Sequence, residues 1–336
     1  MSRSPELLLK PLPFASGKAL PCRILPGPMD GITEQNFLTT MSTRNWVSCW
    51  WTPFLRISTG VPRRTRLAAW LKPYLDTGFP VIVQIMGTAT DKLAETAARL
   101  HEIGVLCVDL NCACPSPKVL SNQGGGACLK NPIWIRDTLL AMRKRCGNKA
   151  ISVKIRAGHC SVQELPAIAA AIRQGQPDLV TMHYRTVSEM YSPITEGLQR
   201  LSLARELLPD LPLFGSGDLF TPDDALQMFQ IAEVDGVMPA RGLLVNPALL
   251  IEIRAACAGL PISTLTNVEK ILFLRDLAQP AVLRRQAPNG FVLRMCATLF
   301  GRQSELFQHL VALRKQQASW EYLNSLYQDQ SLPNYK

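Results

Sequence analysis

Short apolar runs alternate with segments of helical periodicity along most of this 336-residue chain, and this alternation restricts the fold more than any other feature. The segments 91–103 and 162–174, for example, carry apolar residues three and four positions apart, which is the spacing of an amphipathic helix. The apolar runs between such segments have the length and residue types of buried strands. Eight of them are predicted to be strands, at 23–28, 46–54, 81–86, 105–110, 151–155, 179–183, 211–216 and 236–240.

Strands that alternate with helices predict a parallel sheet, because each helix returns the chain to the starting end of the next strand. Eight such repeats over roughly 250 residues predict a closed (β/α)8 TIM barrel, which we assign to residues 1–260. A doubly wound sheet is the alternative. It is disfavoured because no GxGxxG follows the first predicted strand and because polar residues follow many of the strands.

The strand pattern stops after Pro261, and the rest of the chain is predicted to be helical. Helices are expected at 267–285, 291–300, 304–316 and 319–326. A polar break at 288–290 separates the first two of them. Residues 261–336 are therefore predicted to form a small, all-helical C-terminal domain.

The composition indicates a globular protein, since 47% hydrophobic and only 18% charged residues provide enough apolar surface to offset the entropy of folding. No apolar run approaches the ~20 residues of a membrane span, and the start of the chain lacks the apolar segment of a secretory signal. The ten cysteines follow neither a disulfide framework nor a CxxC zinc pattern. We therefore expect a cytoplasmic protein with reduced thiols, no membrane contact and no metal, and we expect it to be a monomer.

The net charge of +10 favours a polyanionic partner, because binding to phosphates releases their counterions. The basic residues form three clusters along the chain. These are Arg63, Arg64, Arg66 and Lys72; Arg143, Lys144, Arg145 and Lys149; and Arg284, Arg285, Arg294, Arg302, Arg314 and Lys315. A solvated surface explains each cluster taken singly about as well as RNA binding does.

Polar and glycine residues gather just after the predicted strands, where a TIM barrel carries its active site. The runs are Pro28-Met29-Asp30-Gly31, Gln84, Asn111-Cys112-Ala113-Cys114-Pro115, Lys154-Ile155-Arg156, His183-Tyr184-Arg185, Gly215-Ser216-Gly217-Asp218 and Ala240-Arg241-Gly242. The last two occupy the usual phosphate site of such barrels, so a phosphate-bearing cofactor is expected there. Taken singly, each run has a plainer explanation, such as a turn at 215–217, a buried amide at Gln84 or a rim lysine at Lys154.

The motifs of this chain resemble those of a known family. The run VDLNCACPSPKVLSNQGGGACLKNP (108–132) resembles the LNxGCP…GxGAxLL signature of tRNA-dihydrouridine synthases. PGPMDGIT, VIVQIMG, ISVKIRAG, HYRT, GSGDL and GVMPARG follow the family's order and spacing, so the likeness covers about residues 22–250. In the tail, ELFQH (305–309) is similar to a phrase of bacterial subgroup C, which acts on uridine 16 of the D-loop.

The resemblance implies reduction of the C5–C6 double bond of a tRNA uridine, with FMN as cofactor and NADPH (or NADH) as reductant. Cys114, immediately before a proline, matches the family's proton donor, on a mobile loop that includes Gly124, Gly125 and Gly126. A thiol suits this task because its ordinary pKa, about 8.5, keeps it protonated at neutral pH. An inert buried cysteine is the alternative.

Other site residues are carried over from the same likeness. Lys154 resembles the lysine beside the flavin N1–C2 edge, and His183 the histidine near flavin and uracil. The remaining cofactor contacts implied are Gln84, Pro28, Met29 and Asp30 at the ring, and Ser216, Gly217, Asp218, Ala240 and Arg241 at the ribityl and phosphate groups. Implied substrate contacts are Asn111, Arg185 and, in the tail, Arg294.

Four positions depart from the family's pattern. Ser216 stands where asparagine is usual, Ala240 and Tyr184 where glycine is usual, and Pro53 where an acidic residue is usual. Two other functions remain open beside the main one. They are a small-molecule flavin barrel that acts on free pyrimidines, and an RNA-binding protein that kept the fold and lost flavin catalysis.

Overall fold

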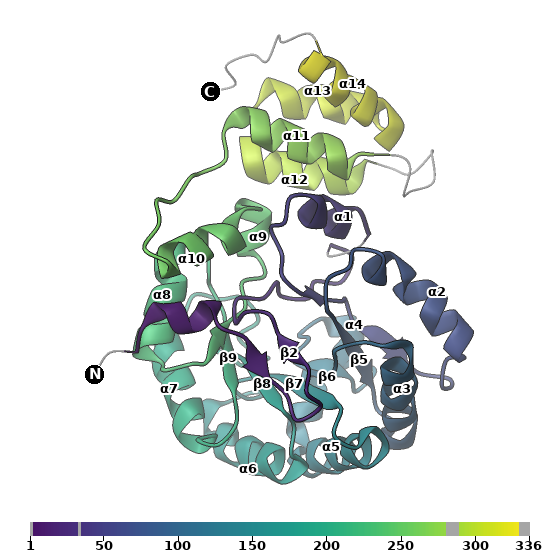
Figure 1. Ribbon diagram of the computed structural model, residues 1–336, viewed down its shortest axis with the longest axis vertical. Coiled ribbons are helices and arrows are strands. Elements are labelled where there is room, and N and C mark those ends of the chain that lie inside the picture. Colours follow the sequence, from purple (N-terminus) through teal and green to yellow (C-terminus); the bar gives the residue numbers. More distant parts are fainter. Residues whose placement is uncertain (1–2, 33–34, 280–288, 329–336) are drawn as a thin grey trace.

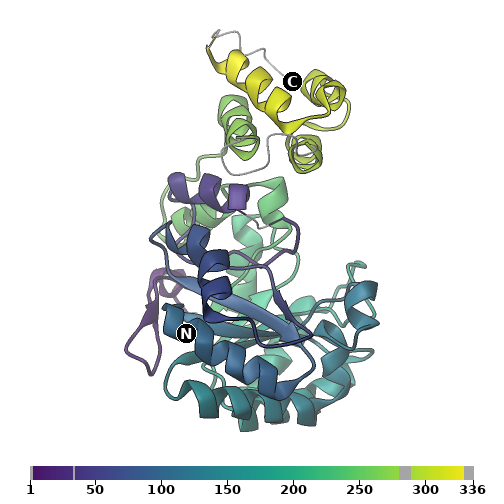
Figure 2. The same ribbon diagram turned by 90° about the vertical axis from the view of Figure 1, so that its right-hand side faces the viewer.

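A barrel of parallel strands lies below a bundle of C-terminal helices in the computed structural model, which describes residues 3–32, 35–279 and 289–328 (Figures 1 and 2). The eight-stranded sheet has the order β10-β9-β8-β7-β6-β5-β3, and β4 also pairs with β5. All of these pairings are parallel, which confirms the predicted (β/α)8 barrel. The strands are β3 (Trp50–Trp51), β4 (Leu55–Ile57), β5 (Val81–Gly87), β6 (Cys107–Cys112), β7 (Ala150–Arg156), β8 (Leu179–His183), β9 (Leu213–Ser216) and β10 (Gly236–Val237).

Four predicted strands are shorter than expected, and two of them, 211–216 and 236–240, are reduced to 213–216 and 236–237. The segment 23–28 pairs with the last strand through a single parallel bridge between Ile24 and Val237, with further bonds from the N–H groups of Leu25 and Gly27. The predicted strand 46–54 contains only the two-residue strand β3, and β4 begins beyond that range, on the other side of Pro53. Proline has no N–H to donate to the ladder, so the strand is interrupted there.

The interior of the barrel is layered. Its lower end is filled by an apolar cluster that includes Trp51, Ile82 and Phe214. An N-terminal hairpin of β1 (Leu12–Pro13) and β2 (Ala19–Leu20), which the sequence analysis did not predict, contributes to this cluster. Above it, the side chains become polar toward the carboxyl ends of the strands, where the candidate site lies.

Helices cover the outside of the barrel, as the predicted alternation requires (Figure 1). Between them and the strands lies the main apolar core. The predicted helix 91–103 is confirmed by α3, and 162–174 is a short 3-10 turn followed by α6. The helices and 3-10 turns of this part are η1 (Pro5–Leu9), α1 (Gln35–Thr43), α2 (Arg64–Leu75), α3 (Thr90–Ile103), α4 (Pro117–Leu120), η2 (Gly125–Lys130), α5 (Pro132–Cys146), η3 (Val162–Glu164), α6 (Leu165–Gly175), α7 (Gly197–Leu207), α8 (Pro222–Ile231), α9 (Gly242–Val245) and α10 (Leu249–Cys257).

The C-terminal helices are α11 (Asn267–Leu277), α12 (Gly290–Phe300), α13 (Glu305–Leu313) and α14 (Gln316–Gln328). The prediction of one helix over 267–285 is wrong, because α11 ends at Leu277. Part of that range, with Arg284 and Arg285, lies outside the described residues. The predicted break after residue 316 instead falls at Arg314, whose φ of +56° ends α13.

None of the helices within residues 3–32, 35–279 and 289–328 combines the length and the apolar character of a membrane span.

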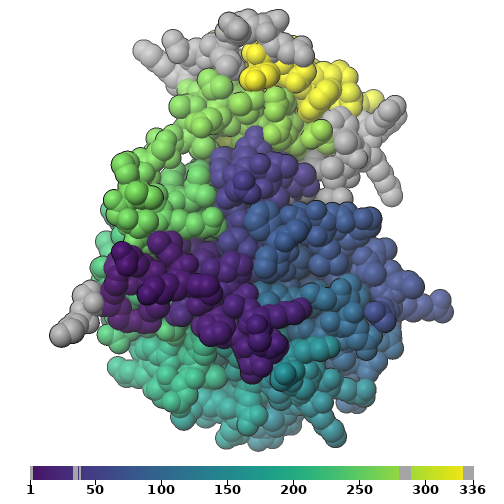
Figure 3. All heavy atoms as spheres, in the orientation of Figure 1, coloured from purple at the N-terminus to yellow at the C-terminus, as the bar shows by residue number. Residues whose placement is uncertain are grey.

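Aromatic packing joins the C-terminal helices to the barrel. Helix α1 lies between the two parts (Figures 1 and 3) and contacts α11. Phe273 of α11 packs edge-on against Phe37 at 6.2 Å and stacks on Trp46 at 5.7 Å. Arg44 lies over Phe273 and forms an ion pair with Asp276 at 2.6 Å. This contact fixes where the helical unit stands above the barrel.

Replacing Phe273 with alanine should lower the free energy of unfolding by about 3–5 kcal/mol, because the side chain is fully buried and leaves a cavity. Urea unfolding measures the change, and limited proteolysis should show faster cleavage between α10 and α11. Replacing the exposed Val311 with alanine is the control, and should change stability by less than about 0.5 kcal/mol. An F273A protein as stable as the wild type would contradict the role given to this contact.

Candidate active site

A cavity of about 520 Å³ opens at the carboxyl ends of the barrel strands, within the size range of cofactor sites. Nearly all of the predicted site residues line it. They are Pro28, Met29, Asp30, Gln84, Asn111, Cys114, Lys154, His183, Ser216, Gly217, Ala240, Arg241 and Arg294. Since Arg294 belongs to α12, the cavity is formed by the barrel and the helical unit together.

Cys114 is held by a tight turn after β6. Oδ1 of Asn111 accepts hydrogen bonds from the backbone N–H groups of Ala113 and Cys114, at 3.0 and 3.1 Å. Gly125 and Gly126 pack directly beneath: a Cβ on either would lie within about 3 Å of Cys114. These glycines therefore have a packing role under the thiol. Burial raises the pKa of Cys114, so the thiol is protonated at neutral pH.

Lys154 brings a cation without a fixed partner into the cavity. Its ammonium group has no hydrogen-bond acceptor among the described residues. Burial and, next, the charge of Arg156 lower the pKa of Lys154 to about 8, while the charge of Asp109 opposes the change. Lys154 is still mostly charged at neutral pH. It is placed to meet an acceptor or a negative charge on a ligand.

His183 is neutral and presents one defined hydrogen-bond donor. Burial lowers its pKa well below the usual value, and the charges of Arg156, Lys154, Arg185 and Arg241 act in the same direction. Nδ1 accepts a hydrogen bond from the backbone N–H of Arg185 at 3.2 Å. A neutral imidazole that accepts at Nδ1 carries its proton on Nε2, so the other nitrogen is a donor.

Glycines compensate for two of the departures from the family pattern. A Cβ on Gly27 would lie 2.7 Å from the Cβ of Ala240, so the extra methyl of Ala240 fits because Gly27 has no side chain. A Cβ on Gly217 would collide with the ring of Tyr184. The hydroxyl of Tyr184 accepts the backbone N–H of Asp218 at 2.8 Å. That N–H is thereby unavailable to a phosphate.

Two predicted contact residues, Arg185 and Asp218, lie behind the cavity wall. Arg185 is buried and donates to both carboxylate oxygens of Asp218, at 3.0 and 2.6 Å, and to the carbonyl of Ser192. Asp218 also pairs with Arg241 at 2.5 Å. Hydrogen bonds and ion pairs within the protein already occupy all of these groups. The geometry of Arg185 and Asp218 therefore does not support direct contact with substrate or cofactor. They orient Arg241, which does line the cavity.

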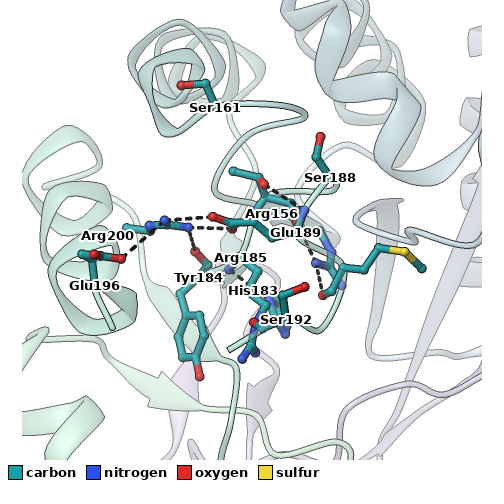
Figure 4. Close-up of polar contacts among 12 residues, drawn as sticks. Arg156, Ser161, His183, Tyr184, Arg185, Ser188, Glu189, Ser192, Glu196 and Arg200 are labelled. Carbon is teal, nitrogen blue, oxygen red and sulfur yellow. Dashed lines mark hydrogen bonds and ion pairs between the residues drawn. The ribbon is translucent and has the colours of Figure 1, made fainter. Parts of the chain in front are cut away.

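Arginines also brace the loop between β8 and α7 (Figure 4), and part of this loop lines the cavity. Arg156, almost fully buried, donates to the carbonyls of Ala113, Thr186 and Met190, at 2.8–2.9 Å. On the other side, Arg200 forms an ion pair with Glu189 at 2.7 Å (Figure 4). The loop is thus tied to the turn that carries Cys114.

Several cavity residues were not predicted as site residues. They are Ile32, Phe54, Ala113, Pro115, Ser116, Arg156, Met190, Tyr191 and Leu244. Tyr191 is half exposed, with the guanidinium of Arg241 4.5 Å and that of Arg156 5.5 Å from its ring centre. Arg156 stood in a polar run after a predicted strand, so its signal was present. Tyr191 lies in a loop without periodicity, so only the fold reveals its position.

Replacing Lys154 with methionine should stabilise the ligand-free protein by about 3 kcal/mol at neutral pH. The pKa of Lys154 is lower in the folded protein than in the unfolded chain, so its protonation disfavours folding at neutral pH. The penalty disappears as the pH rises from about 8 through 10.5. Urea unfolding across this pH range measures it, with the exposed Lys144→Met as control. Equal stability of K154M and wild type at neutral pH would contradict the assignment.

Comparisons with known proteins agree with this geometry. Residues 24–281 match the family model described as dihydrouridine synthase. The tRNA-dihydrouridine(16) synthase of Escherichia coli (strain K12) is 32% identical over 233 residues, which cover 68% of this chain and 74% of that protein. The protein of the same name from Neisseria meningitidis serogroup A is 26% identical over 296 residues, covering 85% of this chain and 86% of that protein.

Among solved structures, TcOYE with pHBA has a TM-score of 0.56 at 11% identity, covering 78% of this chain and 96% of that chain. A 2-naphthoyl-CoA reductase complex has a TM-score of 0.59 at 13% identity, covering 87% of this chain and 58% of that chain. At these identities the likeness concerns the fold alone. Because the family model spans most of its length, this chain belongs to the dihydrouridine synthase family.

Proposed function

We propose that this protein reduces the C5–C6 double bond of uridine 16 in the D-loop of tRNA, with FMN as cofactor and NADPH as reductant. One observation carries the proposal: a protonated thiol, a neutral histidine donor and a lysine without a hydrogen-bond partner among the described residues line the same cavity. The names of the relatives support the substrate and the position. Because tRNA is the substrate, we also propose a cytoplasmic location.

The residues that line the cavity fit an FMN group. Lys154 would face the N1–C2 edge of the ring, where a cation stabilises negative charge, and Gln84 would bond the ring edge. Gly217 would hold the phosphate through its backbone, which carries no side chain. Arg241 would hold it through its guanidinium group, which Asp218 orients. When bound, FMN would supply a hydride to C6 of the uracil, and NADPH would restore it.

Cys114 would give the second hydrogen, as a proton, to C5 of the uracil. The raised pKa keeps this proton on the thiol until carbanion character develops at C5. Nε2–H of His183 would donate to a uracil or flavin carbonyl and hold it in position.

A uridine inside folded tRNA cannot reach this cavity, so it must be turned out of its stack. Arg294, from α12, and the exposed ring of Tyr191 lie at the opening, where they would meet the backbone and the extruded nucleotide. We therefore assign tRNA binding to the helical domain, residues 261–336, together with the rim of the catalytic barrel, residues 1–260.

Replacing Cys114 with alanine should lower the rate of tRNA reduction by about 100- to 10,000-fold, the usual contribution of a general acid. The variant should keep its flavin absorbance, because no proposed cofactor contact is removed. Mass spectrometry of nucleosides from tRNA that lacks dihydrouridine measures the rate. Cys160→Ala is the control, since Cys160 is exposed and lies outside the cavity. A C114A protein that reduces tRNA as fast as the wild type would reject the proton-donor role.

Mapping the product should place dihydrouridine at position 16 alone. Fragments of the treated tRNA, sequenced by mass spectrometry, give the position directly. Dihydrouridine at another position would reject the assignment to uridine 16 but would still support the proposed reduction of a tRNA uridine. No dihydrouridine, in a protein that lacks flavin absorbance and binds tRNA, would favour the RNA-binding alternative.

A further inference from the structure

Asp109 carries a buried carboxylate that lies beneath the candidate active site. The proposed reaction does not use this carboxylate. Asp109 lies on β6, its side chain is fully buried, and it is not among the residues that line the cavity. In the parallel register, Asp109 is paired with Gln84 of β5 and with Ser152 of β7. Oγ of Ser152 donates to its Oδ1 at 2.7 Å.

A chain of hydrogen bonds with a single direction leads from Asp109 to the turn that carries Cys114. Nε2 of Gln84 donates to Oδ2 of Asp109 at 2.7 Å, and Nδ2 of Asn111 donates to Oε1 of Gln84 at 2.7 Å. Oδ1 of Asn111 then accepts the N–H groups of Ala113 and Cys114. An ionised carboxylate can only accept, so it determines which way each amide side chain points.

We propose that Asp109 is a positioning residue for the reduction, because its carboxylate fixes the direction of this chain and thereby holds the Cys114 thiol in place. The inference rests on the proposed function, in which Cys114 gives the proton. Asp109 touches neither substrate nor cofactor. It acts through Gln84 and Asn111.

A neutral group at position 109 removes the constraint. A protonated aspartate, or an asparagine, offers both a donor and an acceptor, so Gln84 can turn over and present its carbonyl to residue 109. Its amide group would then face Nδ2 of Asn111, donor against donor. That hydrogen bond would be lost, and the Asn111 side chain that caps the turn of Cys114 would no longer be fixed from below.

The charge state of Asp109 changes within an accessible pH range. Burial raises its pKa to about 6, and the hydrogen bonds from Gln84 and Ser152 oppose the rise. The titratable groups that face it are Lys154, Cys107 and Cys112. The pKa of Lys154 is about 8 and those of both thiols are well above 9, so none of them titrates near pH 6. The wild-type rate should therefore fall as the pH drops through about 6.

The first test measures thiol position rather than activity. In the flavin-loaded, tRNA-free protein, iodoacetamide should alkylate Cys114 severalfold faster in Asp109→Asn than in the wild type, as resolved by peptide mass spectrometry. The charges that act most on this thiol belong to Asp30, Arg156 and Lys154, so a change of rate reports position. The peptide of the exposed Cys160 is the internal control. Equal rates at Cys114 would overturn the proposal.

The second test is the pH profile of tRNA reduction. D109N should lower kcat about 10- to 100-fold, as small misplacements of reacting groups do, leave KM for tRNA unchanged, and lack the fall near pH 6. Its melting temperature should be no lower than that of the wild type, because a buried charge is removed. A profile identical to that of the wild type would overturn the proposal.

Ser152→Ala keeps the proposal testable if D109N does not fold. It removes one hydrogen bond from the ionised carboxylate and leaves Gln84 in place, so the acid limb should move to higher pH while the rate at alkaline pH is retained. An acid limb at the same pH in S152A and in the wild type would contradict the role of Asp109. If the wild type does not reduce tRNA at all, the proposed function fails, and the alkylation rates still decide whether Asp109 positions Cys114.

Discussion

The parallel register of β5 to β9 is the constraint on which the site depends. It places Gln84 beside Asp109, Asn111 beside Lys154, and His183 beside Ser216. Side chains two residues apart on a strand share a face, so one shift of register would turn these groups out of the barrel. The apolar cluster at the lower end and the ladder of backbone bonds hold that register, so the chemistry of the cavity rests on packing far below it.

Stability and chemistry compete in the upper half of the barrel. Asp109 is buried and Lys154 is partly buried, both in charge states that burial disfavours, as the shifts of their pKa values show. A protein selected for stability alone would replace both with neutral side chains. Hydrogen bonds from Gln84 and Ser152 offset part of the cost at Asp109. Lys154 makes no such bond with the part of the chain that the structure describes, which is consistent with a site whose remaining acceptor comes from a ligand.

Much of this arrangement could be read from the sequence, because periodicity and strand-end polarity are local signals. They located the barrel strands, the helical tail and the strand-end runs that supply most of the cavity residues. Contacts between residues that lie far apart in the chain could not be predicted from these local signals. The partners of Arg185 and Asp218 lie on other loops, and only the fold shows that these two residues bind each other behind the wall. Tyr191 likewise enters the cavity through a loop held by Arg156, which no local pattern predicts.

The most direct test of the central claim separates the two half-reactions. Purified, flavin-loaded protein is reduced by NADPH without oxygen, excess NADPH is removed, and tRNA lacking dihydrouridine is added while the visible absorbance of the flavin is followed. We expect the absorbance to return with stoichiometric formation of dihydrouridine, and to return far more slowly in C114A. Recovery with free uridine or uracil as fast as with tRNA, or no recovery with tRNA at all, would contradict a tRNA reductase.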